Sequence, residues 1–156
     1  MFLSVIDHSP EIQRRPTADG PSLVAVVLDG SPTSWRAFAW ALGHARRSRC
    51  PILAIYAARS ARSMAAMAYL FPLSASAPVD DLMRRSEAMV ADDVRHEAER
   101  SAAECGVPIQ FREMTGASPR ALLAAAARDG ADLLVTGARR PLSRGRGRSV
   151  PLVVIP

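Results

Sequence analysis

The sequence predicts an α/β domain built on a doubly wound, open parallel sheet, and two observations support this fold class. Short, continuously apolar runs alternate along the chain with longer segments in which apolar residues recur every three or four positions. A run that is apolar at every position is typical of a strand buried on both faces, and the intervening helices indicate parallel strands joined by crossovers. In such a sheet, ligands bind beyond the carboxyl ends of the strands, where the winding direction reverses.

Five segments are expected to form the strands. The first, Leu23 to Leu28, is entirely aliphatic and lies between Pro21 and the turn Asp29-Gly30-Ser31. The other four expected strands, in chain order, are residues 52–57, 107–114, 132–136 and 152–155.

Three helices are expected between these strands. Ser31-Pro32 and Ser118-Pro119 each place an N-cap serine before a proline at the first helical position. The helices are expected at residues 31–47, 79–106 and 118–130. Helical periodicity directs the following side chains toward the sheet: Trp35, Phe38, Ala39 and Leu42; Leu82, Met83, Met89, Val90, Val94, Ala98 and Ala102; Leu122, Leu123, Ala126 and Ala127.

A chain of 156 residues fits one domain with its own hydrophobic core. Residues 1–21 show no sustained period and are interpreted as a flexible leader, which leaves 22–156 as the folded domain. Residues 58–78, rich in alanine, methionine and serine, are expected to form a long, partly mobile connection.

The composition predicts a cytoplasmic protein that favours anionic partners. No apolar run approaches the roughly 20 residues of a membrane span, and the N-terminus lacks the basic region of a secretory signal. The formal charge of +5 comes entirely from arginine, since the sequence has no lysine. Arginine forms paired hydrogen bonds with phosphate or carboxylate, but net charge does not choose among nucleotide, nucleic acid and acidic protein.

Catalytic and metal sites are not expected. His8, His44 and His96 lie in different segments without a matching nucleophile, and no paired-carboxylate or metal-ligand motif is present. Cys50 and Cys105 each lack a second thiol at metal or redox spacing, so both are interpreted as buried, reduced core residues. The protein is therefore expected not to be an enzyme.

Three segments carry a resemblance to a known family. Residues 26–31 (VVLDGS), followed by Ser34, Ala37 and Trp40-Ala41, resemble the opening strand and helix of universal stress proteins. Residues 130–137 (GADLLVTG) resemble their fourth strand and the turn after it, and residues 151–155 (PLVVI) resemble their closing strand. The resemblance covers the chain from about Leu23 to Pro156.

The resemblance implies a five-stranded sheet of order 3-2-1-4-5, the adenine nucleotide alpha hydrolase-like fold. It also implies a homodimer formed through the closing strand, Leu152 to Ile155. In one branch of the family it implies ATP binding at a glycine-rich loop after the fourth strand, where small residues let phosphates approach the backbone closely.

The residues that match this nucleotide site are Asp29 for the base or ribose, Ala57 beside the adenine, Thr136 and Gly137 at the end of the fourth strand, and Gly147, Ser149 and Val150 along the phosphates. Arg140 stands where the family has its second glycine, and Gly147-Arg148-Ser149 replaces an adjacent Gly-Ser. In this reading Arg139 and Arg140 supply charge to the phosphates. The helix that the family places before its closing strand has no counterpart, since Val150 is followed directly by Pro151.

Two functions therefore stay open. The first is a stress-response regulator that binds ATP or a related adenine nucleotide, and the second is a dimerisation and interaction module that binds none. In the second reading Asp29 is a turn or cap residue and Gly137 a turn glycine. The arginine-rich run at 139–148 contains no aromatic residue for base stacking, so a nucleic-acid partner is not expected.

Overall fold

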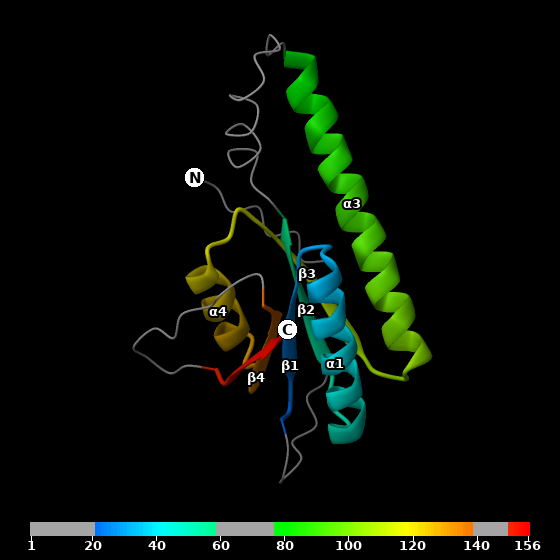
Figure 1. Ribbon diagram of the computed structural model, residues 1–156, viewed down its shortest axis with the longest axis vertical. Helices are drawn as coiled ribbons and strands as arrows, with labels where there is room; N and C mark the ends of the chain where they lie inside the picture. The colour runs from blue at the N-terminus through cyan, green and yellow to red at the C-terminus, as the bar shows by residue number, and fades with distance from the viewer. Residues whose placement is uncertain (1–20, 59–76, 139–149) are drawn as a thin grey trace.

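Five parallel strands form a single sheet in the computed structural model, which describes residues 21–58, 77–138 and 150–156 and, for residues 77–83, only the backbone. The strands across the sheet are, in order, β3 (Ile109–Thr115), β2 (Ile52–Ala58), β1 (Val24–Leu28), β4 (Leu133–Gly137) and β5 (Leu152–Ile155). This arrangement confirms the predicted order 3-2-1-4-5 (Figure 1). The winding direction reverses between β1 and β4, which is where a ligand site is expected.

Three helices are described: α1 (Pro32–Ser48), α3 (Ala77–Glu104) and α4 (Pro119–Arg128). The two Ser-Pro starts behave as the sequence predicts. The hydroxyl of Ser31 accepts a hydrogen bond from the Ser34 N–H, and that of Ser118 accepts one from the Ala121 N–H, each at 3.2 Å. α3 begins two residues before its expected start at Val79.

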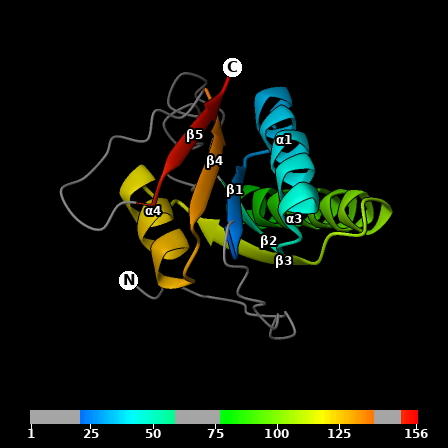
Figure 2. The same cartoon turned by 90° about the horizontal axis from the view of Figure 1, so that it is seen from below.

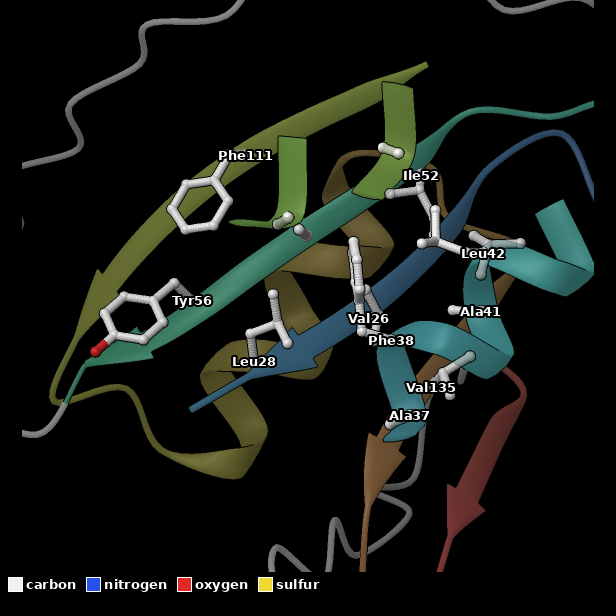
Figure 3. Close-up of a cluster of buried hydrophobic side chains, with 14 of the residues drawn as sticks. Val26, Leu28, Ala37, Phe38, Ala41, Leu42, Ile52, Tyr56, Phe111 and Val135 are labelled. Atoms are coloured by element: carbon white, nitrogen blue, oxygen red, sulfur yellow. The ribbon is translucent and has the colours of Figure 1, made fainter. Parts of the chain in front are cut away.

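The helices cover the two faces of the sheet unequally. α1 and α3 pack against one face, whereas α4 packs against the other (Figure 2). Alternate residues along β1 show the division, because Val26 and Leu28 face α1 and α3 while Val27 faces α4. Figure 3 shows the larger of the two clusters, in which Phe38 of α1 lies over the central strands.

Among the side chains that the structure describes, four that were expected to face the sheet are exposed instead; those of Leu82 and Met83 lie outside the described set. Ala39 and Ala127 lie just outside the buried stripes of α1 and α4, where Ala41 and Ala125 take the inner positions. Met89 and Val90 are 68% and 47% exposed. The reason is the length of α3, whose N-terminal half extends beyond the ends of the strands (Figure 1). From residue 84 on, where its side chains are described, the buried stripe begins at Ala91 and continues through Val94, Ala98 and Ala102.

Asp132 joins the start of β1 to the start of β4. One oxygen of its carboxylate accepts hydrogen bonds from the Ser22 N–H at 2.7 Å, the Ser22 hydroxyl at 2.6 Å and the Leu23 N–H at 3.2 Å. These contacts fix the position of β1 along β4, where Val26 lies opposite Val135. The carboxyl ends of the two strands consequently finish side by side.

The interpretation of both cysteines as core residues is confirmed for Cys50, which is buried, while Cys105 is half-buried at the margin of the same cluster. Both thiols are free. The leader 1–20 and the connection 59–76 lie outside the described residues. Within the described part of the chain, no helix has the length and apolar character of a membrane span.

Candidate functional site

The turn between β1 and α1 is held by a network of short-range hydrogen bonds. Asp29 accepts a hydrogen bond at Oδ1 from the Ser31 N–H at 2.9 Å. The buried Ser34 hydroxyl donates to the Ser31 carbonyl at 2.9 Å and accepts from the Asp29 N–H at 3.3 Å. Gly30, with a φ of 78°, supplies the left-handed residue that the turn requires. The Asp29 carboxylate is therefore held in a fixed place at the carboxyl edge of the sheet.

Gly137, the last residue of β4, lies against the first turn of α1. A methyl group built at its Cα would lie 2.9 Å from both the carbonyl carbon and the carbonyl oxygen of Thr33. Thr33 follows Asp29 by four residues, in the first turn of the helix that the Asp29 turn leads into. The expected adjacency of the Asp29 turn and the Gly137 turn is therefore confirmed. This pair of turns lies at the reversal point of the sheet and forms the candidate site.

Ala57 and Thr136 lie at the same edge, near the ends of β2 and β4, but each is only 2% exposed. The Ala57 methyl group packs into the cluster beneath α4. The Thr136 hydroxyl donates a hydrogen bond to the Gly137 carbonyl at 3.3 Å. Both residues therefore support the floor of the site from within the sheet, and neither presents its side chain to solvent.

Val150 is not brought to this edge. β5 runs parallel to β4, with Leu152 opposite Leu134 and Ile155 opposite Gly137. Val150 precedes β5, so it lies at the amino edge of the sheet, roughly one strand length from Gly137, and packs against the cluster beneath α4. The placement of Val150 along the phosphates was wrong because a chain entering a parallel strand must first return to the amino edge.

The other four expected site residues, Arg139, Arg140, Gly147 and Ser149, lie outside the described residues. Sequence reasoning missed Thr33 as the neighbour of Gly137 and Ser34 as the buried hydroxyl that closes the turn. A serine three residues after the N-cap was the available signal for Ser34. Among the described residues, no group of three or more histidine, cysteine or acidic side chains could hold a metal ion.

Comparison with known proteins finds one matching family model. The model of the universal stress protein family matches residues 23–152. No curated protein matches the chain. A solved universal stress protein family structure from Burkholderia pseudomallei is 26% identical, with a TM-score of 0.60, and the match covers 86% of this chain and 95% of that one.

Two further solved structures are similar in fold. A universal stress protein in complex with cAMP is 22% identical, with a TM-score of 0.60 over 88% of this chain and 98% of that one. An Arabidopsis thaliana universal stress protein family structure with AMP bound is 21% identical, with a TM-score of 0.56 over 85% of this chain and 90% of that one.

Proposed function

Because the chain belongs to the universal stress protein family, we propose that it binds an adenine nucleotide between the Asp29 turn and the Gly137 turn and acts as a non-catalytic stress-response regulator. The observation that carries the proposal is the adjacency of these turns at the reversal point of the sheet. Two proteins of the same fold hold AMP or cAMP. A cytoplasmic location, expected from the sequence, is part of the proposal.

Asp29 is the residue on which we expect nucleotide affinity to depend. Its Oδ1 atom is engaged by the Ser31 N–H, so the carboxylate is oriented before any ligand arrives. A carboxylate fixed in this way can accept hydrogen bonds from a ribose hydroxyl or an adenine amino group at little entropic cost. Arg139, Arg140 and Gly147 stay as the predicted phosphate ligands. Ser149 is not proposed again, because it is bonded to Val150 at the amino edge of the sheet.

A binding measurement decides which of ATP, AMP and cAMP the protein binds. The thermal transition of the purified protein is measured with each at millimolar concentration, and the denatured protein is examined by mass spectrometry for released nucleotide. A binding nucleotide raises the transition temperature in proportion to the logarithm of its concentration. If none of the three changes the transition and none is released, the nucleotide proposal fails.

The substitution Asp29→Asn tests whether the nucleotide binds at the Asp29 turn. The amide oxygen of asparagine still accepts from the Ser31 N–H, so the fold should be preserved while the charge is lost. We expect nucleotide affinity to fall about tenfold, the effect of one charge-assisted hydrogen bond. Asp92→Asn, an exposed site on α3, is the matched control and should leave affinity unchanged. Equal affinity in both variants would move the site away from Asp29.

The alternative is an interaction module that binds no nucleotide. It is favoured by the burial of Ala57 and Thr136, whose side chains are packed inside the protein and are not available to a ligand.

Both alternatives include a homodimer through β5. The Leu134 N–H donates to the Pro151 carbonyl at 2.8 Å, and the Ala138 N–H donates to the Ile155 carbonyl at 2.9 Å. Since backbone groups of successive residues point to opposite sides of a strand, the N–H and C=O groups of Leu152 and Val154 point to the open edge.

The positions of these groups support one register for the proposed dimer. A second copy that pairs antiparallel about a twofold axis at Val153 would place Leu152 of one copy opposite Val154 of the other. Each such pair exchanges both its N–H and its C=O groups, so the outward-pointing groups of the edge would all be satisfied. Val154, 48% exposed in the single chain, would lie next to the axis, beside Leu152 of the other copy.

A further inference from the structure

The outer face of α1 carries an unusual set of side chains. No acidic residue occurs anywhere in Pro32–Ser48. The helix instead carries three exposed arginines, at positions 36, 46 and 47, and Arg49 follows at its cap. The same face carries Trp40, which is 36% exposed, whereas most of the large apolar side chains that the structure describes are buried.

Two of these arginines, Trp40 and a glycine form a single row along the helix. Arg36, Trp40, Gly43 and Arg47 are spaced by four, three and four residues, which places them on one side of an α-helix over about 16 Å. We call these four residues the α1 row. A methyl group built at Gly43 would lie 3.4 Å from Nη1 of Arg47, so the Arg47 guanidinium folds back along the row toward Trp40.

Trp40 is held in place by its neighbour one turn along the helix. The rings of Trp40 and His44 stack with centroids 5.2 Å apart and planes 5° from parallel. This contact fixes the indole on the surface without burying it. An aromatic side chain that is ordered before binding loses little entropy when a partner covers it.

The stability of the helix explains only part of this arrangement. Arginines in the last turn, such as Arg46 and Arg47, complement the negative end of the helix dipole. That effect fades within one turn, so it gives no reason for Arg36, which lies near the opposite end. Nor does it account for an exposed tryptophan. Tryptophan and arginine together are the residue types most enriched where proteins bind one another.

The neighbouring helix limits what the row can bind. α3 packs against the same face of the sheet as α1 (Figure 2). Its exposed charged side chains between residues 91 and 104 are five acidic residues and one arginine, Arg100, which pairs with Glu97; Arg84 and Arg85 lie in its first half. The acidic residues are Asp92, Asp93, Glu97, Glu99 and Glu104. A polyanion or an anionic membrane that extends from α1 across the second half of α3 would meet mostly carboxylates there and be repelled. A ligand confined to the length of the row would avoid them.

We propose that the α1 row is a docking surface for a short acidic segment of a partner protein, with Trp40 as its apolar anchor and with Arg36 and Arg47 as its carboxylate ligands. The guanidinium groups form charge-assisted hydrogen bonds with glutamate or aspartate side chains of the partner. The row lies on the outer face of the helix, so docking there is independent of the nucleotide site.

The test uses the full chain and a fluorescein-labelled oligoglutamate of about 12 residues, which as a helix matches the length of the row. Binding is followed by fluorescence anisotropy at low salt. Arg36→Glu/Arg47→Glu should weaken binding at least about tenfold, because two charge-assisted contacts are lost. Trp40→Ala should weaken it by a smaller factor. Arg36→Gln/Arg47→Gln, which introduces no new charge, should also weaken binding of oligoglutamate.

Arg120→Glu/Arg128→Glu is the matched control. These two exposed arginines lie on α4, on the other face of the sheet, and the substitution changes net charge by the same amount. The control should bind oligoglutamate within about twofold of the parent protein, since net charge alone is not expected to determine affinity. Equal losses in the two double variants would overturn the proposal, as that would show attraction to net charge.

Two other probes separate the partner classes. Oligothymidine of the same length and vesicles containing phosphatidylserine are titrated against the same variants. Binding of either that is as strong as that of oligoglutamate, and lost in Arg36→Glu/Arg47→Glu, would also overturn the assignment of an acidic protein segment. Because Arg36, Arg47 and Trp40 are surface residues, an unchanged thermal transition should show that the variants remain folded.

Discussion

Gly137 packs directly on the backbone of Thr33, so the end of β4 and the first turn of α1 are in contact with no side chain between them. The contact joins the two segments that flank the reversal point of the sheet. One side of the Gly137 backbone is therefore covered by the helix. Any ligand at this edge must therefore approach from the side of the Asp29 turn rather than between β4 and α1.

Gly137→Ala is expected to destabilise the protein by about 1 to 3 kcal/mol, because the new methyl group would meet fixed backbone atoms at 2.9 Å. Urea unfolding measures the change. Gly43→Ala is the control: its methyl group would meet only the movable end of Arg47 at 3.4 Å, and alanine favours a helix, so stability should not fall. If the two variants were equally stable, the close contact with Thr33 would be refuted.

Most of the fold could be predicted because its signals are local. The aliphatic run Leu23 to Leu28 identifies β1, and the Ser-Pro pairs at Ser31 and Ser118 identify two helix starts, since capping depends on residues within one turn. The strand order came from the resemblance to a family. The adjacency of Asp29 and Gly137 follows from that order, because two neighbouring parallel strands end at the same edge.

The features that the sequence did not predict depend on tertiary structure, such as where the strands beneath a helix end. Periodicity correctly places Met89 and Val90 on a helix, but their exposure is decided by the length of the strands beneath, which leaves that part of α3 without a partner in the sheet. Val150 was misplaced for a related reason, because a motif spacing does not show which edge of the sheet a residue reaches. The contact of Gly137 with Thr33 is a tertiary contact that no local pattern encodes.

The ion pair between Arg112 of β3 and Asp129, which caps α4, should contribute measurably to stability. Their side chains are 18% and 19% exposed, and Nη1 of Arg112 lies 2.5 Å from Oδ2 of Asp129. A double-mutant cycle with Arg112→Met and Asp129→Asn is expected to give a coupling of about 1 to 2 kcal/mol, less than for a fully buried pair.

The Arg100 and Glu97 pair on α3 is the comparison for that cycle. It is also close, but its side chains are 67% and 46% exposed, so solvent screens the attraction. We expect its coupling to be much smaller than that of Arg112 and Asp129. Equal couplings would show that burial does not strengthen the pair at the β3 edge.

Burial raises the pKa of the Cys50 thiol, with a smaller contribution of the same sign from the charge of Asp132. The folded protein therefore holds the thiol proton more tightly than the unfolded chain does. This contribution to stability is fully present below the ordinary cysteine pKa of about 8.5 and is lost as the pH rises above it. Unfolding free energies between about pH 7 and 10 should decline less steeply in Cys50→Ala than in the parent protein.

Val154→Pro should separate the proposed homodimer without unfolding the chain. Proline removes the N–H of Val154, which points to the open edge, and leaves the hydrogen bonds between β4 and β5 in place. The outward-pointing donor that the proposed register needs is then missing in each copy, so light scattering should report a monomer. Val153→Pro removes an N–H that points toward β4 and should instead lower the unfolding temperature. A Val154→Pro protein that scatters as a dimer would contradict the proposed register, because two of its four backbone hydrogen bonds would be missing and the proline ring would meet the Leu152 carbonyl of the other copy.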